Sequence, residues 1–464
     1  MIDEDTIAAI ATPLSPSGVG VIRISGAKAP HILFALFKRS HDTHNWQSHR
    51  LYFGSVIEPV SGALLDKALA VWMRAPHSYT QEQVVEFHCH GGPVVLAQVL
   101  QACLNRGARL AKPGEFTLRA FLNGALSLDE AEAVADLISA KTSTAAQLAL
   151  NQLTGTLSNR LKPLEKELLA LLAQIAVGVD FPEDADAPTA QYLLSRLQAL
   201  RQTINEVLAG AMEGRLYREG LAVVLSGAGN VGKSSLFNCL LNSHRAIVDG
   251  EAGTTRDIIE ETINVGGLPL ILSDTAGFRE QSGLSQVESQ GIERSRAALA
   301  KAGLVLIVTD GILGLDNTAK ALLQEISPKK RLLVLNKIDI LNETELQKRL
   351  AEYAKCCPPQ DVLAVSAKNG AGVSQLLAKI GEKALSGVNK TAGSPWLTNI
   401  RHQEALQKAD SALAEAEAAL TSGFTPDVAA IDLENAYIAI GEISGHTVGE
   451  EVLNNIFANF CLGK

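Results

Sequence analysis

A glycine-rich segment in the middle of the chain directly follows an apolar run, and this junction constrains the fold more than any other feature. The run LAVVLSG leads into residues 227–234, GAGNVGKS, which match the pattern G-x-x-x-x-G-K-[ST] and then enter a helical stretch. The glycines let successive backbone N–H groups curl around phosphate oxygens, which also lie at the N-terminus of the helix. Apolar runs alternate with helical stretches across residues 220–384, and this alternation indicates a parallel α/β sheet.

Three further motifs follow in the order that a GTP-binding domain requires, each at the end of an apolar run. DTAG (274–277) ends the run LPLILSD, NKID (336–339) ends RLLVLNKID, and SAK (366–368) follows LAV. Asp274 would place a carboxylate near the bound metal. Asp339 can accept two hydrogen bonds from the guanine N1–H and amino group, which adenine does not offer. Because all four motifs occur in order at predicted strand ends, the sequence predicts a domain that binds and hydrolyses GTP.

Individual roles within these motifs are predicted from the chemistry of the side chains. Lys233 is a catalytic candidate that reaches the β- and γ-phosphates, and the hydroxyls of Ser234 and Thr255 are the expected Mg²⁺ ligands. Phe278 follows DTAG and cannot orient water, and no arginine finger can be assigned, so these residues alone predict slow turnover. The residues expected from these motifs to contact GTP are Asn230, Val231, Gly232, Lys233, Ser234, Ser235, Thr255, Asp274, Thr275, Ala276, Gly277, Asn336, Lys337, Asp339, Ser366, Ala367 and Lys368.

The pattern of residues that predicts secondary structure changes three times along the chain. The length of 464 residues, at about 150 residues per domain, suggests three domains. Short β-rich runs occupy residues 1–118, a helical pattern covers 119–219, the α/β segment spans 220–384, and helical texture returns over 385–464. Each helical half has an amphipathic stripe that needs a partner, so we expect the α/β domain to be inserted into one helical domain. The predicted fold class is multidomain α/β, with an N-terminal α+β domain and an inserted P-loop GTPase domain that has a Ras-like sheet.

Composition and charge exclude several classes of protein. A hydrophobic fraction of 47% with a net charge of −9 excludes extensive disorder and a histone-like polycation. Residues 401–464 hold three basic and ten acidic residues, so an RNA partner is expected to avoid the C-terminal helices. The N-terminus lacks a signal peptide, and the longest apolar run, 168–179, is far shorter than the roughly 20 residues of a membrane span. We therefore expect a cytoplasmic protein without membrane attachment.

Two cysteine-containing segments have side chains that could form a chemical site. His88 and His90 would share one face of a strand and could ligate a metal, but no second pair at ligand spacing accompanies them, so we expect no metal there. The six cysteines form no disulfide framework, and Cys461 is expected to be a buried structural thiol.

Segments spread over essentially the whole chain resemble the MnmE or TrmE family of tRNA-modifying GTPases. They are TIAAIATP, GVGVIRISG, EFHCHGGP, KPGEFTLRAFLNGAL, DEAEAVADLI, AIVDGEAGTTRD and the terminal CLGK. The resemblance implies a homodimer held by its N-terminal domains, with K⁺-dependent hydrolysis as two GTPase domains meet across their nucleotide faces. It also implies that Glu288 is a second catalytic residue, which orients the attacking water. The K⁺ ligands that it implies are Asn230, Asp249, Glu251 and Thr254, and the further GTP contacts are Asp249, Gly250, Glu251, Ala252, Gly253 and Thr254.

The same resemblance implies a second ligand in the N-terminal domain, a tetrahydrofolate derivative of the 5-formyl or methylene type. Arg23, Glu82 and Lys464 match the family's folate-binding positions, whereas Ala125 stands where a lysine is usual. The implied reaction adds a carboxymethylaminomethyl-type group at C5 of the wobble uridine of certain tRNAs. The implied partner is a flavoprotein of the MnmG (GidA) type. In the segment expected to bind K⁺, Asp249 stands where the family usually has Thr or Ser.

Two other functions remain open from the sequence. An Era-like GTPase switch in ribosome assembly would need an RNA-binding module after residue 384, and none is evident there. A folate-binding enzyme with a purely regulatory GTPase would keep both sites but separate their activities.

Overall fold

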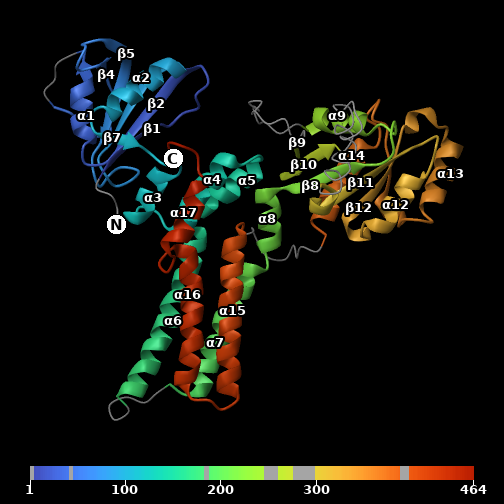
Figure 1. The fold of residues 1–464 in the computed structure, drawn as a ribbon. Helices are drawn as coiled ribbons and strands as arrows, with labels where there is room; N and C mark the ends of the chain where they lie inside the picture. Colours follow the sequence, from blue (N-terminus) through green and yellow to red (C-terminus); the bar gives the residue numbers. More distant parts are fainter. Residues whose placement is uncertain (1–4, 41–44, 182–187, 245–259, 275–297, 387–396) are drawn as a thin grey trace, which may run out of the picture. The chain divides into compact units, whose positions relative to one another are not determined.

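The computed structural model describes residues 5–40, 45–181, 188–244, 260–274, 298–386 and 397–464 (Figure 1). The chain folds into two compact units that interleave along the sequence. Unit 1 consists of Met1–Ala135, Gln152–Val177 and Leu433–Lys464, and unit 2 of Asp136–Asn151 and Gly178–Asp432. In the part of the chain that is described, no helix is both long and apolar enough to cross a membrane.

Unit 1 is built on a seven-stranded sheet with the strand order β3-β4-β5-β6-β2-β1-β7. Its strands are β1 (Thr6–Ile10), β2 (Ser17–Ser25), β3 (Phe37–Arg39), β4 (Tyr52–Ile57), β5 (Leu64–Met73), β6 (Val84–Gly91) and β7 (Ala108–Leu110). Strand β2 alternates between buried and half-buried residues from Gly20 to Ile24. Ile22 and Ile24 are buried against the helices α1 (Ala29–Leu36) and α2 (Pro93–Leu104), which lie against this sheet (Figure 1). Successive residues of a strand point to opposite faces, so Arg23 points away from these helices.

The remaining helices of unit 1 place the C-terminus of the chain beside the sheet. They are α3 (Glu115–Leu122), α4 (Leu128–Ser139), α6 (Thr156–Asp180), α16 (Pro426–Ser444) and α17 (Glu450–Ala458), of which α4, α6 and α16 cross a unit boundary. Phe457 of α17 and Phe460 are buried against Leu128. The terminal segment then runs along β1, where a Cβ on Gly463 would lie only 2.5 Å from the main-chain oxygen of Ile10.

Unit 2 contains a six-stranded sheet with the order β13-β12-β11-β8-β10-β9, parallel except for β9. Its strands are β8 (Leu221–Ser226), β9 (Glu260–Val265), β10 (Leu268–Asp274), β11 (Leu304–Asp310), β12 (Arg331–Asn336) and β13 (Val362–Ala364). Helices cover both faces. They are α9 (Lys233–His244) and α14 (Val373–Ala384) on one, and α12 (Asn317–Glu325) and α13 (Glu343–Tyr353) on the other. The α/β fold predicted from the alternating pattern is confirmed.

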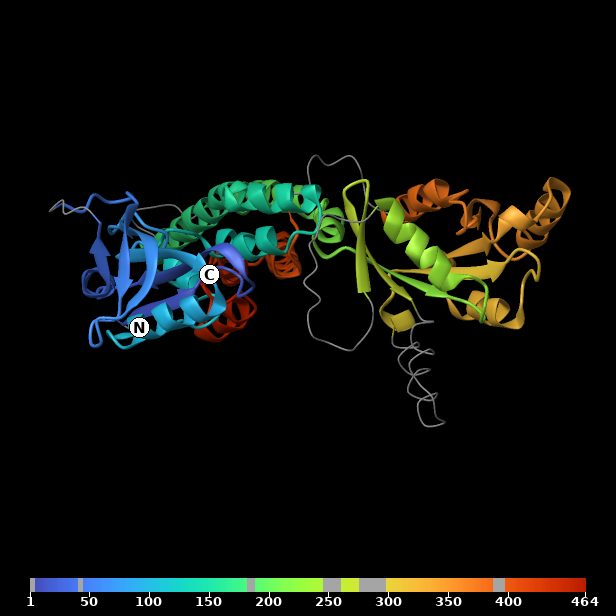
Figure 2. The same cartoon turned by 90° about the horizontal axis from the view of Figure 1, so that it is seen from above.

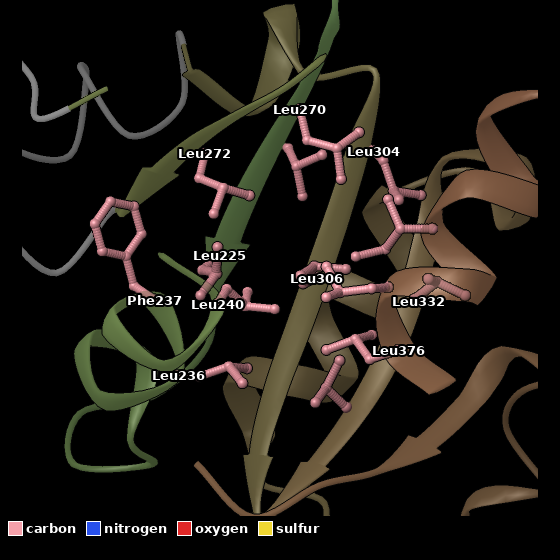
Figure 3. Packing of buried hydrophobic residues seen from close by; sticks show 14 of the residues in the cluster. Leu225, Leu236, Phe237, Leu240, Leu270, Leu272, Leu304, Leu306, Leu332 and Leu376 are labelled. Carbon is pink, nitrogen blue, oxygen red and sulfur yellow. The ribbon is translucent and has the colours of Figure 1, made fainter. Parts of the chain in front are cut away.

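The core on the α9 face of this sheet is rich in leucine, with valine, isoleucine and Phe237 filling the rest. Leu225, Leu272 and Leu306 of three strands face Leu236 and Leu240 of the helix (Figure 3). Figure 2 shows α9 lying along one face of the sheet. Burying each such leucine contributes about 2 kcal/mol, so this packing fixes the start of α9 and the loop before it.

Helices that flank this sheet in the sequence pack against each other within unit 2. They are α7 (Ala190–Leu208), which precedes it together with α5 (Ser143–Leu153) and α8 (Ala211–Glu219), and α15 (Ile400–Thr421), which follows it. Arg201 of α7 pairs with Asp410 at 2.9 Å and with Glu417 at 2.6 Å, both on α15. The residue boundaries expected at 118, 219 and 384 stay predictions, and α3 runs across the first of them.

Candidate functional site

The loop between β8 and α9 has a backbone that only small residues can form. Gly227 has φ +150, and a Cβ there would lie 2.2 Å from the oxygen of Val308. Gly232 has φ +91, and its Cβ would lie 2.4 Å from Nδ2 of Asn336. Asn230 also has a positive φ, of 64, and its side chain is exposed on the turn. The loop is thus wrapped tightly against neighbouring strands, as a phosphate-binding loop has to be.

Lys233 begins α9 and turns back into this loop. Its ammonium donates hydrogen bonds to the oxygens of Gly227 at 3.0 Å and Ala228 at 2.7 Å, and the residue is only 8% exposed. Ser234 and Ser235 follow on the exposed first turn of the helix. The predicted phosphate-binding lysine and Mg²⁺-binding hydroxyl therefore lie on consecutive residues at one helix N-terminus.

Asn336 joins this loop to the loop after β13. Its Nδ2 donates to the oxygens of Val231 at 3.0 Å and Gly232 at 3.4 Å, and its Oδ1 accepts from the N–H of Ala367 at 3.1 Å. The residue is 1% exposed, so these hydrogen bonds form away from water. Asn336 thus connects the loop after β8 to the loop after β13 through hydrogen bonds of its side chain.

Asp339 is exposed, and its carboxylate is oriented by the buried Ser366. The Ser366 hydroxyl donates to Oδ1 of Asp339 at 2.6 Å. Ala367 is partly buried beside it, and Lys368 is exposed. The motifs NKID and SAK, predicted to recognise guanine, are therefore assembled at one edge of the sheet, as expected for the carboxyl ends of parallel strands.

Asp310 also belongs to this constellation, although no motif identified it. Its Oδ2 lies 2.7 Å from the Lys337 ammonium, and its Oδ1 accepts from the N–H of Ile312 at 2.8 Å. Burial raises the pKa of Asp310, but the Lys337 ammonium and the backbone N–H groups outweigh it and hold the pKa below its usual value. The sequence does contain a signal for Asp310: it is an acidic residue at the carboxyl end of β11, the strand that pairs with β8.

A second group of charged residues lies on the face of the unit 1 sheet opposite α1 and α2. The Arg23 side chain donates to Oε1 of Glu86 at 2.7 Å, and its guanidinium lies 5.6 Å from the ring of Tyr79 and 5.7 Å from that of Phe116. Glu86 also contacts Nε2 of His88 at 3.1 Å. Burial acts to raise the pKa of Glu86, yet these hydrogen bonds and charges keep it lowered. The expected folate-binding arginine therefore already has a carboxylate partner.

Glu82 is held from two sides in the same unit. The Ser25 hydroxyl donates to its Oε2 at 2.6 Å, and Nη1 of Arg119 lies 3.2 Å from Oε1. Arg119 is 3% exposed and also binds Asp5 and Glu115. Arg119 could not be identified from the sequence, because its partners Asp5 and Glu82 are 114 and 37 residues away along the chain.

The two remaining folate candidates lie on backbone turns of unit 1. The N–H of Ala125 donates to Ala120 at 2.8 Å, directly after α3, and the N–H of Lys464 donates to Cys461 at 3.4 Å. A cavity of about 360 Å³ lies nearby between α3 and α17, but none of the four candidates lines it. Its lining includes Arg119, which connects the cavity to Glu82.

The segment HCH does not form a metal site in the described part of the chain. His88 contacts Glu86, whereas Nδ1 of His90 lies 2.7 Å from Asp66, and no group of three candidate ligands occurs among the described residues. Cys89 points into the core instead, where burial raises the pKa of its thiol to about 12. The expectation that Cys461 is buried is wrong, because this residue is exposed.

Two family models together match almost the whole chain. The model of the MnmE helical domain matches residues 128–461, and that of the N-terminus of the GTP-binding protein TrmE matches residues 6–125. The chain is 43% identical to the tRNA modification GTPase MnmE of Lactiplantibacillus plantarum over 99% of this chain and 98% of that protein. It is 42% identical to the protein of the same name from Geobacter sulfurreducens over 100% of both. The chain belongs to the MnmE family of tRNA modification GTPases.

Solved structures of other GTPases match parts of the chain. The G domain of the T. maritima FeoB iron transporter is 30% identical, with a TM-score of 0.26, and the match covers 35% of this chain and 98% of that one. Aquifex aeolicus Era bound to GDP·AlF4⁻ is 26% identical, with a TM-score of 0.30, over 41% of this chain and 66% of that one.

Membership of the MnmE family makes the chain a GTPase. Of the residues expected in its two switch segments, only Asp274 belongs to the described part of the chain. Asp274 ends β10, where it is in register with Leu225 of β8, next to the phosphate-binding loop. The other expected residues of the two switch segments lie outside the described residues. They are Asp249, Gly250, Glu251, Ala252, Gly253, Thr254, Thr255, Thr275, Ala276, Gly277 and Glu288.

Proposed function

We propose that this MnmE-family GTPase is activated by K⁺ and acts in the cytoplasm as a homodimer. With a flavin-dependent partner of the MnmG (GidA) type, it adds a carboxymethylaminomethyl-type group at C5 of the wobble uridine of certain tRNAs. A tetrahydrofolate derivative bound to unit 1 supplies the one-carbon unit.

The observation that carries this proposal is the assembly of the phosphate-binding and guanine-binding motifs at one edge of the unit 2 sheet. The described residues provide a phosphate loop, Lys233, and the Asp339–Ser366 pair that selects guanine. Lys233 is the cation that the described residues place at the loop, and we propose that a K⁺ ion adds positive charge where charge develops on the phosphates.

The described side chains suit both cations. Ser234 offers a hydroxyl oxygen at the start of α9 for Mg²⁺, and Asn230 offers an amide oxygen on the exposed turn for K⁺. Bound there, the two ions would supply the positive charge that an arginine finger supplies in other GTPases. Thr255 would complete the Mg²⁺ ligands, and Asp249, Glu251 and Thr254 the K⁺ ligands.

The roles of this chain's own residues follow from these positions. Lys233 exchanges its hydrogen bonds with the loop oxygens for bonds to the β- and γ-phosphates. Asp339 accepts from the guanine edge, and Glu288 orients the attacking water. We expect Glu288→Ala to bind GTP with unchanged affinity and to hydrolyse it at a small fraction of the normal rate, and near-normal turnover would remove Glu288 from this role.

The proposed folate site makes use of the charged face of unit 1. Glu82, held by Ser25 and Arg119, can accept hydrogen bonds from the donor edge of a pterin, and Arg23 can bind a ligand carboxylate in competition with Glu86. Lys464, at the end of the segment that runs along β1, would add a positive charge. Ala125 cannot, so this chain lacks one cation that the family usually has.

The decisive experiment is GTP hydrolysis in KCl and in NaCl at matched ionic strength. The proposal predicts turnover at least tenfold faster in KCl, because the cation supplies charge at the phosphates. Equal rates in the two salts would refute the cation mechanism and leave a GTPase that resembles an Era-type switch. A parallel assay with tRNA, the flavoprotein partner and a folate donor tests the modification itself.

A further inference from the structure

Three loops of unit 2 meet at the side chain of Lys337. Its ammonium donates to the main-chain oxygen of Asn230 at 2.8 Å and lies 2.7 Å from Oδ2 of Asp310. Asn230 and Lys337 follow the strands β8 and β12, and Asp310 is the last residue of β11, which lies between them in the sheet. Lys337 therefore connects the turn of the phosphate loop to the carboxylate at the end of β11.

Asp310 is itself rigidly held. It is 6% exposed, and its Oδ1 accepts from the N–H groups of Ile312 at 2.8 Å and Leu313 at 3.4 Å. The following N–H, of Gly311, donates to the oxygen of Asn336 at 2.8 Å. The carboxylate thus has one orientation, and it gives the long Lys337 side chain a fixed partner.

Asn230 benefits from such a support. It has φ 64, a left-handed conformation that asparagine adopts more readily than other non-glycine residues and that the hydrogen bond from Lys337 further stabilises. Its oxygen receives the Lys337 hydrogen bond, and its neighbours present the backbone N–H groups that would contact phosphate.

We propose that Asp310 is a positioning residue for the nucleotide: acting through Lys337, it fixes the main chain of Asn230 and so the phosphate-binding turn. Asp310 does not touch the nucleotide in this scheme. Its loss leaves the Lys337 ammonium attached to Asn230 alone, and the turn becomes free to relax.

The test is the release rate of a fluorescent N-methylanthraniloyl GDP from the full chain in NaCl, without K⁺. Asp310→Asn keeps the size of the side chain and removes its charge, and we expect release about tenfold faster, as for the loss of one charge-assisted hydrogen bond. An unchanged release rate overturns the proposal.

A double-mutant cycle separates action through Lys337 from any other effect of Asp310. In a chain that already carries Lys337→Ala, adding Asp310→Asn is expected to change the release rate less than twofold. Full additivity of the two substitutions would show that Asp310 acts by another route, and this also overturns the proposal.

Asp316→Ala provides the control for general destabilisation of unit 2. Asp316 caps α12 by accepting from the N–H of Ala319 at 2.7 Å, whereas the carboxylate that pairs with Lys337 is that of Asp310. This variant is expected to lower the melting temperature with normal GDP release. If Asp310→Asn behaved in the same way, its role would be structural and the proposal would fail.

A second readout rests on the proposed function, since Asn230 is a proposed K⁺ ligand. We expect the K⁺ concentration for half-maximal GTP hydrolysis to rise several-fold in Asp310→Asn. If the unsubstituted chain showed no response to K⁺, the cation mechanism would fail, while the GDP release rates would still decide the role of Asp310. If the chain responded to K⁺ and the variant showed the same half-maximal concentration, Asp310 would not act on the cation-binding turn.

Discussion

The hydroxyl of Thr142 donates a hydrogen bond to the main-chain oxygen of Gly267 at 2.9 Å and so attaches the start of α5 to the turn between β9 and β10. Thr142 is 6% exposed, and its hydroxyl also accepts from the N–H of Ala145 at the start of the helix. Strand β10 runs from this turn to Asp274, the first residue of DTAG. One end of the strand thus contacts a helix outside the α/β domain, and the other end carries a nucleotide motif.

This contact predicts different effects of alanine at two adjacent glycines. Both have a positive φ, 60 for Gly266 and 92 for Gly267, but a Cβ at Gly266 meets nothing within 4 Å, whereas one at Gly267 lies 2.3 Å from Oγ1 of Thr144. We expect Gly266→Ala to lower the free energy of unfolding by about 1 kcal/mol. Gly267→Ala should lower it by about 2–4 kcal/mol, because the clash adds to the backbone strain. Urea denaturation checks this, and equal losses would contradict the docking of α5.

Asn336→Ala tests the connection between the phosphate loop and the SAK loop. It removes hydrogen bonds to Val231 and Ala367, and we expect GDP and GTP affinity to fall roughly 30-fold, at about 1 kcal/mol for each of these two buried bonds. The measurement is equilibrium titration with a fluorescent nucleotide. Asn342→Ala is the matched control, since it removes the cap of α13 and should lower stability by about 1 kcal/mol with unchanged affinity. Similar affinity losses in both variants would mean general destabilisation.

Glu115 predicts how the stability of unit 1 depends on pH. Burial raises the pKa of Glu115, but hydrogen bonds from Arg109, Lys112 and Arg119 outweigh it and hold the pKa below the ordinary value of 4.5. A folded-state pKa below the unfolded one stabilises the fold above the unfolded pKa, and this stabilisation is lost as the pH falls through the folded pKa. Glu115→Gln should therefore lower the melting temperature at pH 7, with a difference from the unsubstituted chain that narrows below pH 4.5. A difference that stays constant from pH 7 to pH 3.5 would contradict it.

The meeting of the nucleotide motifs at one edge of the unit 2 sheet could be predicted, because their residues belong to local patterns. Asn336, Asp339 and Ser366 all follow apolar strands, and parallel strands bring their carboxyl ends to one edge whatever the details of packing. The same reasoning placed Lys233 at the start of α9. Such arguments need only the strand ends and the order of the motifs, which are visible in one sequence.

The charged contacts of unit 1 could not be predicted, because they depend on strand register and on pairs far apart in the chain. Arg23 meets Glu86 because β2 and β6 pair antiparallel with these two residues opposite each other. Arg119 meets Asp5 across 114 residues. A shift of one residue in either strand would reverse the faces, and one sequence holds too little information to fix that register. The packing of residues 136–151 with unit 2 escaped prediction for the same reason.

Two substitutions in unit 1 test the proposed folate site from opposite directions. Arg23→Ala should abolish detectable binding of 5-formyltetrahydrofolate, since it removes the cation that lies against Tyr79 and Phe116. Nucleotide affinity should not change, because the residues expected to bind GTP belong to unit 2. Arg50→Ala is the control, an exposed arginine of the same unit whose hydrogen bond goes to Gln47. Unchanged folate binding in Arg23→Ala would remove this residue from the site.

The opposite direction is a gain of affinity at Ala125. This residue is partly buried on the turn after α3, where its N–H bonds to Ala120 and its side chain is free of any hydrogen-bonding role. Ala125→Lys restores the cation that the family usually has, and we expect about a tenfold tighter complex with the dianionic folate, an effect that weakens as ionic strength rises. Isothermal titration at low and high salt measures both. A salt-independent or unchanged affinity would show that position 125 does not face the bound folate, whereas weaker binding would show that it faces the folate too closely to accommodate a lysine.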